Sequence, residues 1–140
     1  MDQAIVACST PPGRGAISVV RISGKEAKSI INNLFSLEFD HGTSKVAETN
    51  LSEGFNEKCL ISCFEGPSSY TGEDVAEISC HGNPLIVRAL IQKCIELGAR
   101  NANPGEFTQR AFLNNKIDLA QSEAAVSYTH LRAHETRTHR

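Results

Sequence analysis

Several features that would each define a class of protein are missing from this chain of 140 residues. It contains no run of about 18 apolar residues that would span a membrane, and Met1-Asp2-Gln3 leads into a strand pattern without an apolar signal region. Basic residues are not in excess either, because 14 Lys and Arg stand against 16 Asp and Glu. A domain without a basic surface is not expected to hold a nucleic-acid backbone alone. We therefore expect a soluble, cytoplasmic protein.

The five cysteines include no Cys-x-x-Cys pair. Cys59 and Cys63 fall in a predicted strand, where residues four apart are separated by about 13 Å, too far to share a metal ion. Cys80 precedes His81, but adjacent strand residues point to opposite faces, so the imidazole is not expected to activate this thiol. The pattern favours reduced thiols in a protein core, and we predict no metal site.

A loop for nucleotide phosphates is also missing. The stretch 11–15 (PPGRG) is glycine-rich and follows a strand pattern. A Walker loop needs the pattern Gly-x-x-x-x-Gly-Lys-Ser/Thr, which occurs nowhere in the sequence. For the loop that is present, a tight turn and a ligand-binding role are about equally supported.

What the sequence does contain is the pattern of one compact domain in which short strands alternate with helices. Strands are predicted at 4–8, 16–22, 57–64, 74–80 and 99–102, with a weaker pattern near 45–49. Helices are predicted at 24–35, 84–97 and 106–114, and a further one starts within 118–125. The pattern indicates an α+β fold with a mixed sheet and flanking helices.

Capping residues support these helix boundaries. Ser23 is expected to cap the first helix, and Asn83, followed by a proline, the second. Gly98 stands at the position where a left-handed residue ends the second helix. Asp118 and Gln121 have the spacing of a capping box.

Arg21 and Glu77 are the candidates for a polar site within the strands. Arg21 alternates with Val20 and Ile22, and Glu77 alternates with apolar residues, so each is expected to point away from the core. A guanidinium among apolar neighbours needs an anionic or carbonyl partner, which is either a ligand or Glu77 itself. The residues alone favour the internal pair, and Lys116 alone is typical of a solvated loop lysine.

Three segments carry a resemblance to a known family. They are STPPGRGAISVVRISG (9–24), SYTGEDVAEISCHG (69–82) and NPGEFTQRAFLNNKIDLAQSEAA (103–125). In this order they are similar to the N-terminal domain of the MnmE (TrmE) family of tRNA-modifying GTPases. The resemblance covers about residues 4–126.

The resemblance implies a division of the chain. Residues 1–119 would form a folate-binding and dimerisation domain, and 120–126 the start of a helical domain. Residues 127–140 change in character: they hold three of the five histidines and no apolar period. We expect them to be a non-native or out-of-frame tail that is disordered or irregularly helical, and we do not treat its histidines as a metal site.

The resemblance also implies a cofactor and its contacts. The fold would resemble the tetrahydrofolate-binding domain of aminomethyltransferases, and the ligand would be 5-formyltetrahydrofolate or a related reduced folate. The family's folate-contacting residues fall on Arg21, Glu77 and Lys116. Glu77 would accept the ring N–H and exocyclic amine of the pterin, while Arg21 and Lys116 would meet its oxygens. No catalytic residue is expected in these 140 residues.

For the whole protein, the resemblance implies a homodimer joined through this domain, acting with the flavoprotein MnmG (GidA) on tRNA. Together they would add a carboxymethylaminomethyl group at carbon 5 of the wobble uridine. GTP, Mg²⁺ and K⁺ would bind segments beyond these residues, so this chain alone is not expected to hydrolyse GTP. Two alternatives remain: a fragment of a folate-dependent one-carbon transferase, or a ligand-free dimerisation module in which Arg21 and Glu77 only pair with each other.

Overall fold

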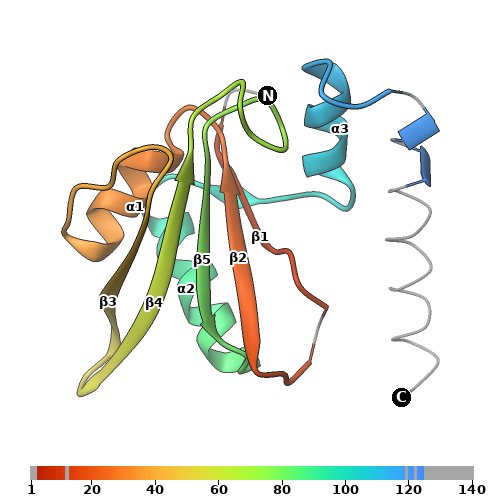
Figure 1. Cartoon of the computed structure of the whole chain (residues 1–140). Helices are drawn as coiled ribbons and strands as arrows, with labels where there is room; N and C mark the ends of the chain where they lie inside the picture. Colours follow the sequence, from red (N-terminus) through yellow and green to blue (C-terminus); the bar gives the residue numbers. More distant parts are fainter. Residues whose placement is uncertain (1–2, 12, 119, 122, 125–140) are drawn as a thin grey trace.

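The computed structural model describes residues 3–11, 13–118, 120–121 and 123–124, which form a six-stranded sheet with helices (Figure 1). The α+β class with a mixed sheet is thereby confirmed. In chain order the elements are β1 (Ile5–Cys8), β2 (Ile17–Ser23), α1 (Ala27–Phe35), β3 (Ser44–Ser52), β4 (Phe55–Phe64), β5 (Val75–His81), α2 (Pro84–Glu96), β6 (Arg100–Asn101) and α3 (Glu106–Leu113).

The strand order across the sheet is β3-β4-β5-β2-β1-β6. Neighbouring strands are antiparallel, except that β6 runs parallel to β1. β2 and β5 are neighbours although α1, β3 and β4 separate them in the sequence, so residues 56 positions apart meet at the centre of the sheet. This long-range pairing creates the site described below.

One face of the sheet packs on α1 and α2, which lie behind the strands in Figure 1. Alternate strand residues point to this face and form the core with the helices, because a strand exposes successive side chains on opposite sides. Core residues from the three central strands include Val20, Ile22, Ile61, Ala76 and Ile78. No helix among the described residues is both long and apolar enough to cross a membrane.

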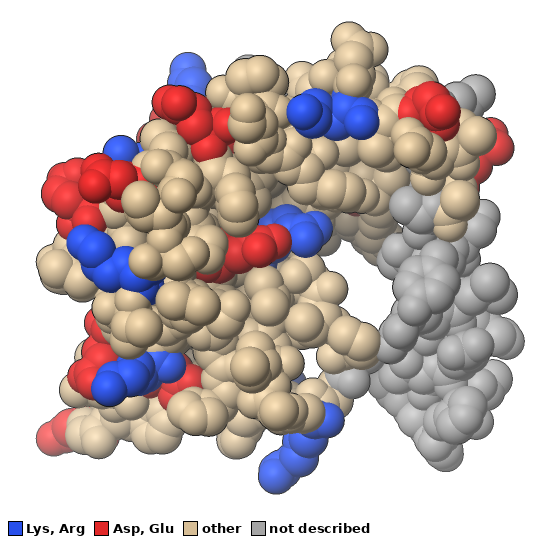
Figure 2. All heavy atoms as spheres, in the orientation of Figure 1, with Lys and Arg blue, Asp and Glu red and all other residues tan. Residues whose placement is uncertain are grey.

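The opposite face of the sheet is not covered by α1 or α2. Val46, Leu60 and Phe64 are 58%, 43% and 38% exposed on β3 and β4. Figure 2 shows this face: charged side chains lie mostly around its rim, and one basic and one acidic group lie next to each other near its centre among uncharged atoms. The polar site therefore lies on an otherwise weakly charged surface.

The first helix differs from the prediction. α1 begins at Ala27 rather than at residue 24, and Ser23 belongs to β2 instead of capping the helix. The Ser23 hydroxyl is already bonded to Thr71 and Glu73. Gly24 has a φ of 143°, and a Cβ there would lie 2.8 Å from the Cα of Ala4, so the chain must turn before a helix can start.

The other boundaries agree closely with the prediction. Asn83 accepts a hydrogen bond from the backbone N–H of Leu85 at 2.8 Å and caps α2. Gly98 has a φ of 117° after the end of that helix. The reciprocal bonds between Asp118 and Gln121, 2.9 and 2.7 Å, are those of the predicted capping box. The predicted tail, 127–140, lies outside the described residues.

The hairpin of β3 and β4 is longer than predicted. Its strands occupy residues 44–52 and 55–64, whereas the sequence predicted 45–49 and 57–64. β3 forms one edge of the sheet and is exposed at most positions, so its sequence has no strong alternation. Edge strands are held by pairing with one neighbour, which a hydrophobic pattern does not reveal.

All five cysteines are free thiols, and Cys59, Cys63, Cys80 and Cys94 are buried. Burial raises the pKa of Cys59 and Cys94 to about 12 and that of Cys80 to about 11. The predicted core location is confirmed for these four, and Cys8 is half-buried.

Candidate functional site

An ion pair marks the centre of the open sheet face. Arg21 on β2 and Glu77 on β5 are direct partners across the two antiparallel strands. The Arg21 Nε donates to Glu77 Oε2 at 3.0 Å, and the two side chains are 23% and 28% exposed. The sequence-based expectation that both point away from the core is confirmed, since Val20 and Ile22 beside Arg21 are fully buried.

Part of the hydrogen-bonding capacity of this pair is available to a ligand. Within the described residues, the Arg21 side chain donates to Glu77, and it does so through Nε alone. The two terminal amino groups of the guanidinium can therefore donate to an additional oxygen, and the second carboxylate oxygen of Glu77 can accept a further N–H.

Two aromatic rings flank the guanidinium of Arg21. Its Cζ lies 5.1 Å from the centre of the Tyr70 ring and 5.6 Å from that of Phe107, both within cation–π range. Tyr70 belongs to the loop between β4 and β5, and Phe107 to α3. A pocket of about 490 Å³ opens here, lined by Arg21, these two rings, the end of β1 and the segment between β6 and α3.

The pocket suits a planar ligand with polar edges. Its volume falls in the usual range for small-molecule sites, and its lining includes two aromatic side chains and one cation among small and polar residues. Sequence reasoning predicted Arg21 but missed Tyr70 and Phe107, because they are adjacent to it only through the tertiary fold.

Lys116, the third predicted contact, lies in the segment after α3. Its backbone N–H donates to the carbonyl of Ala111 at 2.8 Å, and its side chain is exposed. A Cβ built on Gly72 would lie 3.2 Å from the Lys116 Cγ, so the lysine stem packs against the loop that carries Tyr70. The structure thus brings Arg21 and Glu77 into contact, whereas Lys116 reaches the loop beside them.

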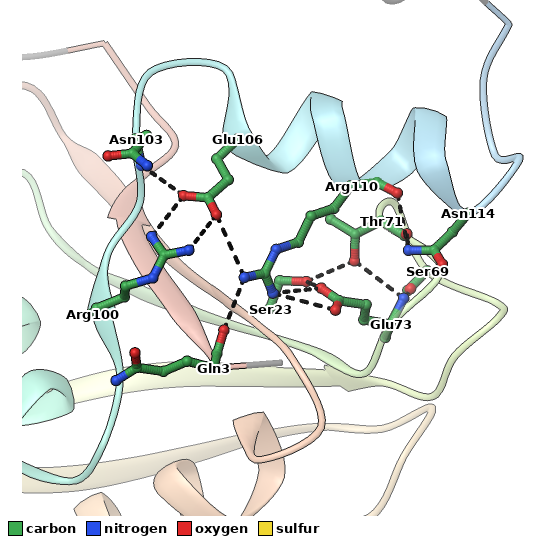
Figure 3. Close-up of polar contacts among 10 residues, drawn as sticks. All are labelled: Gln3, Ser23, Ser69, Thr71, Glu73, Arg100, Asn103, Glu106, Arg110 and Asn114. Carbon is green, nitrogen blue, oxygen red and sulfur yellow. Dashed lines mark hydrogen bonds and ion pairs between the residues drawn. The ribbon is translucent and has the colours of Figure 1, made fainter. Parts of the chain in front are cut away.

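A charged network that was not predicted from the sequence surrounds α3 (Figure 3). Arg110 on α3 is 1% exposed and donates to Glu73 at 3.0 and 3.2 Å and to the carbonyl of Gln3 at 2.9 Å. Arg110 also lies 3.5 Å from Glu106. Arg100 donates two hydrogen bonds to the Glu106 carboxylate, at 2.8 and 2.5 Å. The network joins α3 to Gln3, which lies just before β1, and to the loop that carries Tyr70.

Glu106 is the acidic centre of this network. Its side chain is 8% exposed, and it also accepts the backbone N–H of Asn103 at 2.9 Å. The hydrogen bonds from Arg100, with the bond from Asn103 and the charge of Arg110, lower the pKa of Glu106 from 4.5 to about 2. The carboxylate is therefore charged throughout the physiological range and bonds the first residue of α3 to Arg100 and Asn103.

A second buried carboxylate, Glu57, orients His81 at the far end of β5. Glu57 is 3% exposed, accepts the backbone N–H of His81 at 2.9 Å and lies 2.7 Å from its Nδ1. The His81 ring itself is 72% exposed, while Cys80 points into the core. The predicted separation of Cys80 from His81 is confirmed.

A second cleft, of about 380 Å³, lies between α2 and the loop after β1. Its walls are mainly apolar, with Val87, Ile91 and Ile95 from the helix, and Arg88 is the charged residue among its described lining. Because no acid–base pair converges there, we assign the candidate site to the pocket at Arg21.

Comparison with known proteins identifies the class to which this fold and site belong. The family model for the N-terminus of the GTP-binding protein TrmE matches residues 4–116, which is most of the chain. The chain belongs to this family, and the resemblance seen in the sequence is confirmed.

Named relatives make the assignment more specific. The chain is 45% identical over 127 residues to the tRNA modification GTPase MnmE of Helicobacter pylori strain Shi470, and that alignment covers 90% of this chain and 28% of the relative. It is 48% identical to the MnmE of Flavobacterium johnsoniae, over 89% of this chain and 28% of the relative. For the MnmE of Francisella philomiragia the identity is 49%, over 87% and 27%. The chain thus corresponds to the N-terminal domain of MnmE and spans just over a quarter of these relatives.

Proposed function

We propose that this domain binds a reduced folate, 5-formyltetrahydrofolate or a close relative, in the pocket at Arg21. The observation that carries the proposal is the Arg21–Glu77 pair, partly exposed and with free donors and a free acceptor, beside a pocket with two aromatic walls. Glu77 would accept the N–H groups of the pterin edge, and Arg21 would donate to a carbonyl, formyl or carboxylate oxygen.

Lys116 completes the proposed set of contacts. Its position against the Tyr70 loop supports a role at the rim of the pocket, where a long side chain with three donors reaches ligand oxygens. A bound folate would supply a one-carbon unit, and the role of Arg21, Glu77 and Lys116 is to bind and orient it. We also propose that the fold is related to the folate-binding domain of aminomethyltransferases.

For the whole protein we propose the activity that its relatives' names describe, tRNA modification by a GTPase. In this proposal residues 1–119 form the folate-binding and dimerisation domain, 120–126 begin a helical domain, and 127–140 are a non-native tail. GTP, Mg²⁺ and K⁺ bind elsewhere in the full-length, cytoplasmic protein. The partner is MnmG (GidA), and the product carries carboxymethylaminomethyl at carbon 5 of the wobble uridine.

The open sheet face supports the proposed homodimer. Val46, Leu60 and Phe64 expose apolar surface there without cover from α1 or α2. A second copy of the domain packed on this face would remove that surface from water.

One observation favours a second candidate, a ligand-free dimerisation module. Arg21 and Glu77 are already bonded to each other at 3.0 Å, as expected if their role is only structural. The two candidates predict different effects on ligand affinity when the charge of Glu77 is removed. Because both side chains are partly exposed, the pair itself contributes at most about 1 kcal/mol to stability.

The test is calorimetric titration of 5-formyltetrahydrofolate into the protein and into its Glu77→Gln variant, with the oligomeric state followed by light scattering. The control is Glu48→Gln, the same change at an exposed site on β3 of the same sheet. A hydrogen bond to a charged group contributes about 1.5–3 kcal/mol, so Glu77→Gln should weaken binding roughly tenfold or more while Glu48→Gln leaves it unchanged. Absence of saturable binding by the folded, unaltered protein would favour the ligand-free module.

A further inference from the structure

We propose that Arg110 is a positioning residue for the pocket at Arg21. Its buried ion pair with Glu73 fixes the loop of residues 65–74 against α3 and so holds Tyr70 and Phe107 on the guanidinium of Arg21. This inference concerns how the pocket is built, and its consequence for ligand affinity rests on the proposed folate site.

The first support is that the segment directly after Tyr70 is bonded to α3 and to Asn114, the residue that follows this helix. After Tyr70, Thr71 is fully buried, and its carbonyl accepts a hydrogen bond from the side-chain amide of Asn114 at 2.9 Å. Two residues further on, the Glu73 carboxylate accepts hydrogen bonds from Nη1 of Arg110 at 3.0 and 3.2 Å. Before Tyr70, the Ser69 hydroxyl donates to the carbonyl of Glu73, which closes the loop on itself.

The end of β2 anchors the same loop from the other direction. The hydroxyl of Ser23 donates to Glu73 Oε1 at 2.8 Å and lies 2.7 Å from the hydroxyl of Thr71. Glu73 therefore accepts hydrogen bonds from Ser23 in the sheet and from Arg110 in α3 (Figure 3). Because Arg21 lies two residues before Ser23 on the same strand, this carboxylate links the strand of Arg21 to the helix of Phe107.

The pocket side of α3 completes the geometry. Phe107 and Arg110 are three residues apart and so lie about one turn from each other. Between them Thr108, 8% exposed, lies 3.0 Å from the hydroxyl of Tyr70. The tyrosine is thus tied to α3 at its tip by Thr108 and at its base by the network, and a shift of α3 would move both aromatic walls together.

The energetics indicate a role in placement. Taking a guanidinium out of water costs several kcal/mol, and its ion pairs with Glu73 and Glu106 offset this cost only when the geometry is good. The Nε of Arg110 is buried without an acceptor among the described residues, so the compensation is incomplete. A cluster of this kind adds less to stability than a well-packed apolar one, whereas its directional bonds fix the angle at which the loop meets the helix.

Tyr70 provides a direct probe of this positioning. The sequence has no tryptophan and two tyrosines, Tyr70 and Tyr128. In a Tyr128→Phe background, fluorotyrosine incorporated into the full chain gives one fluorine resonance, which reports the surroundings of Tyr70. We would record it for Glu73→Gln, for Arg110→Lys and for the control Arg100→Gln. The control breaks the other ion pair of Glu106, and within the described part of the chain Arg100 forms no hydrogen bond or ion pair with the loop. Glu73 is 21% exposed and Gln is isosteric, so this variant is the one expected to remain folded.

The proposal predicts that Glu73→Gln and Arg110→Lys shift or broaden the Tyr70 resonance and weaken 5-formyltetrahydrofolate binding about tenfold. Arg100→Gln should lower the denaturant midpoint and leave both readouts unchanged. An unmoved resonance in Glu73→Gln, or an equal change in Arg100→Gln, would overturn the positioning role. If the unaltered protein binds no folate, the proposed function fails, while the tyrosine resonance still decides whether Arg110 positions the pocket.

Discussion

The buried carboxylate of Glu106 leads to a quantitative prediction about acid stability. Its two bonds from Arg100 and the bond from Asn103 hold its pKa at about 2 in the folded protein, against 4.5 for an ordinary glutamate. Each tenfold change in proton affinity corresponds to about 1.4 kcal/mol, so this difference corresponds to at most about 3 kcal/mol of folding free energy. Water around Arg100, whose side chain is 35% exposed, screens part of it. Replacing Glu106 by Gln should remove this contribution at pH 7.

The sign of the pH dependence follows from the lowered pKa. Stabilisation by Glu106 is complete above pH 4.5, where the unfolded chain is also ionised, and it is lost as the pH falls from 4.5 towards about 2. Urea unfolding followed by circular dichroism should therefore give a difference of about 2–3 kcal/mol in unfolding free energy between the unaltered protein and Glu106→Gln at pH 7. The gap should close across this acidic window.

A control separates this effect from the loss of any negative charge. Glu96, at the end of α2, is exposed, and its replacement by Gln should change the unfolding free energy by less than about 0.5 kcal/mol at every pH. A gap for Glu106→Gln below about 1 kcal/mol at pH 7, or one that stays constant from pH 5 to pH 2, would refute the linkage between the ion pairs and stability.

Two further predictions concern packing and thiol chemistry. A Cβ on Gly82 would lie 2.2 Å from the carbonyl oxygen of Gly15, which is a backbone atom. Gly82→Ala should therefore lower the unfolding free energy by about 3 kcal/mol in urea titrations. Gly15→Ala is the control, and it should change the unfolding free energy little because the space around its Cβ is open. A thiol reagent at pH 8 should modify Cys8 alone in the native protein and all five cysteines in urea. The reason is that burial raises the pKa values of the four buried thiols. Rapid modification of two or more thiols in the native protein would contradict this.

The parts of the fold that the sequence predicts well are those with strong local signals. α2 begins at a side-chain cap and ends before a left-handed glycine, both visible in the sequence as Asn83 and Gly98. Strand alternation correctly placed Arg21 and Glu77 on the side away from the core. What alternation does not provide is the register between strands, and the contact between these two residues depends on that register.

The prediction that failed at Ser23 shows where local signals compete. A serine before an apolar helical pattern is a good N-cap, but this hydroxyl bonds Thr71 and Glu73, which are about 50 residues away in the sequence. The charged network escaped prediction for a related reason. Glu106 and Arg110 are spaced like an ordinary surface pair on a helix, and only the surrounding fold makes them buried.

The two sets of ion pairs in this domain therefore have different physical roles. The Arg21–Glu77 pair is partly exposed, contributes at most about 1 kcal/mol and keeps donors and an acceptor free, so its cost of separation is low enough for a ligand to compete for it. In the pairs around Glu106 and Arg110 one partner is buried, and removing the other would leave a buried charge without compensation. The cost lies toward the lower end of the range of about 3–5 kcal/mol, because Arg100 and Glu73 are 35% and 21% exposed. If the proposed ligand binds, the Arg110–Glu73 pair would hold the two aromatic walls in place while the more exposed Arg21–Glu77 pair exchanges partners with the ligand.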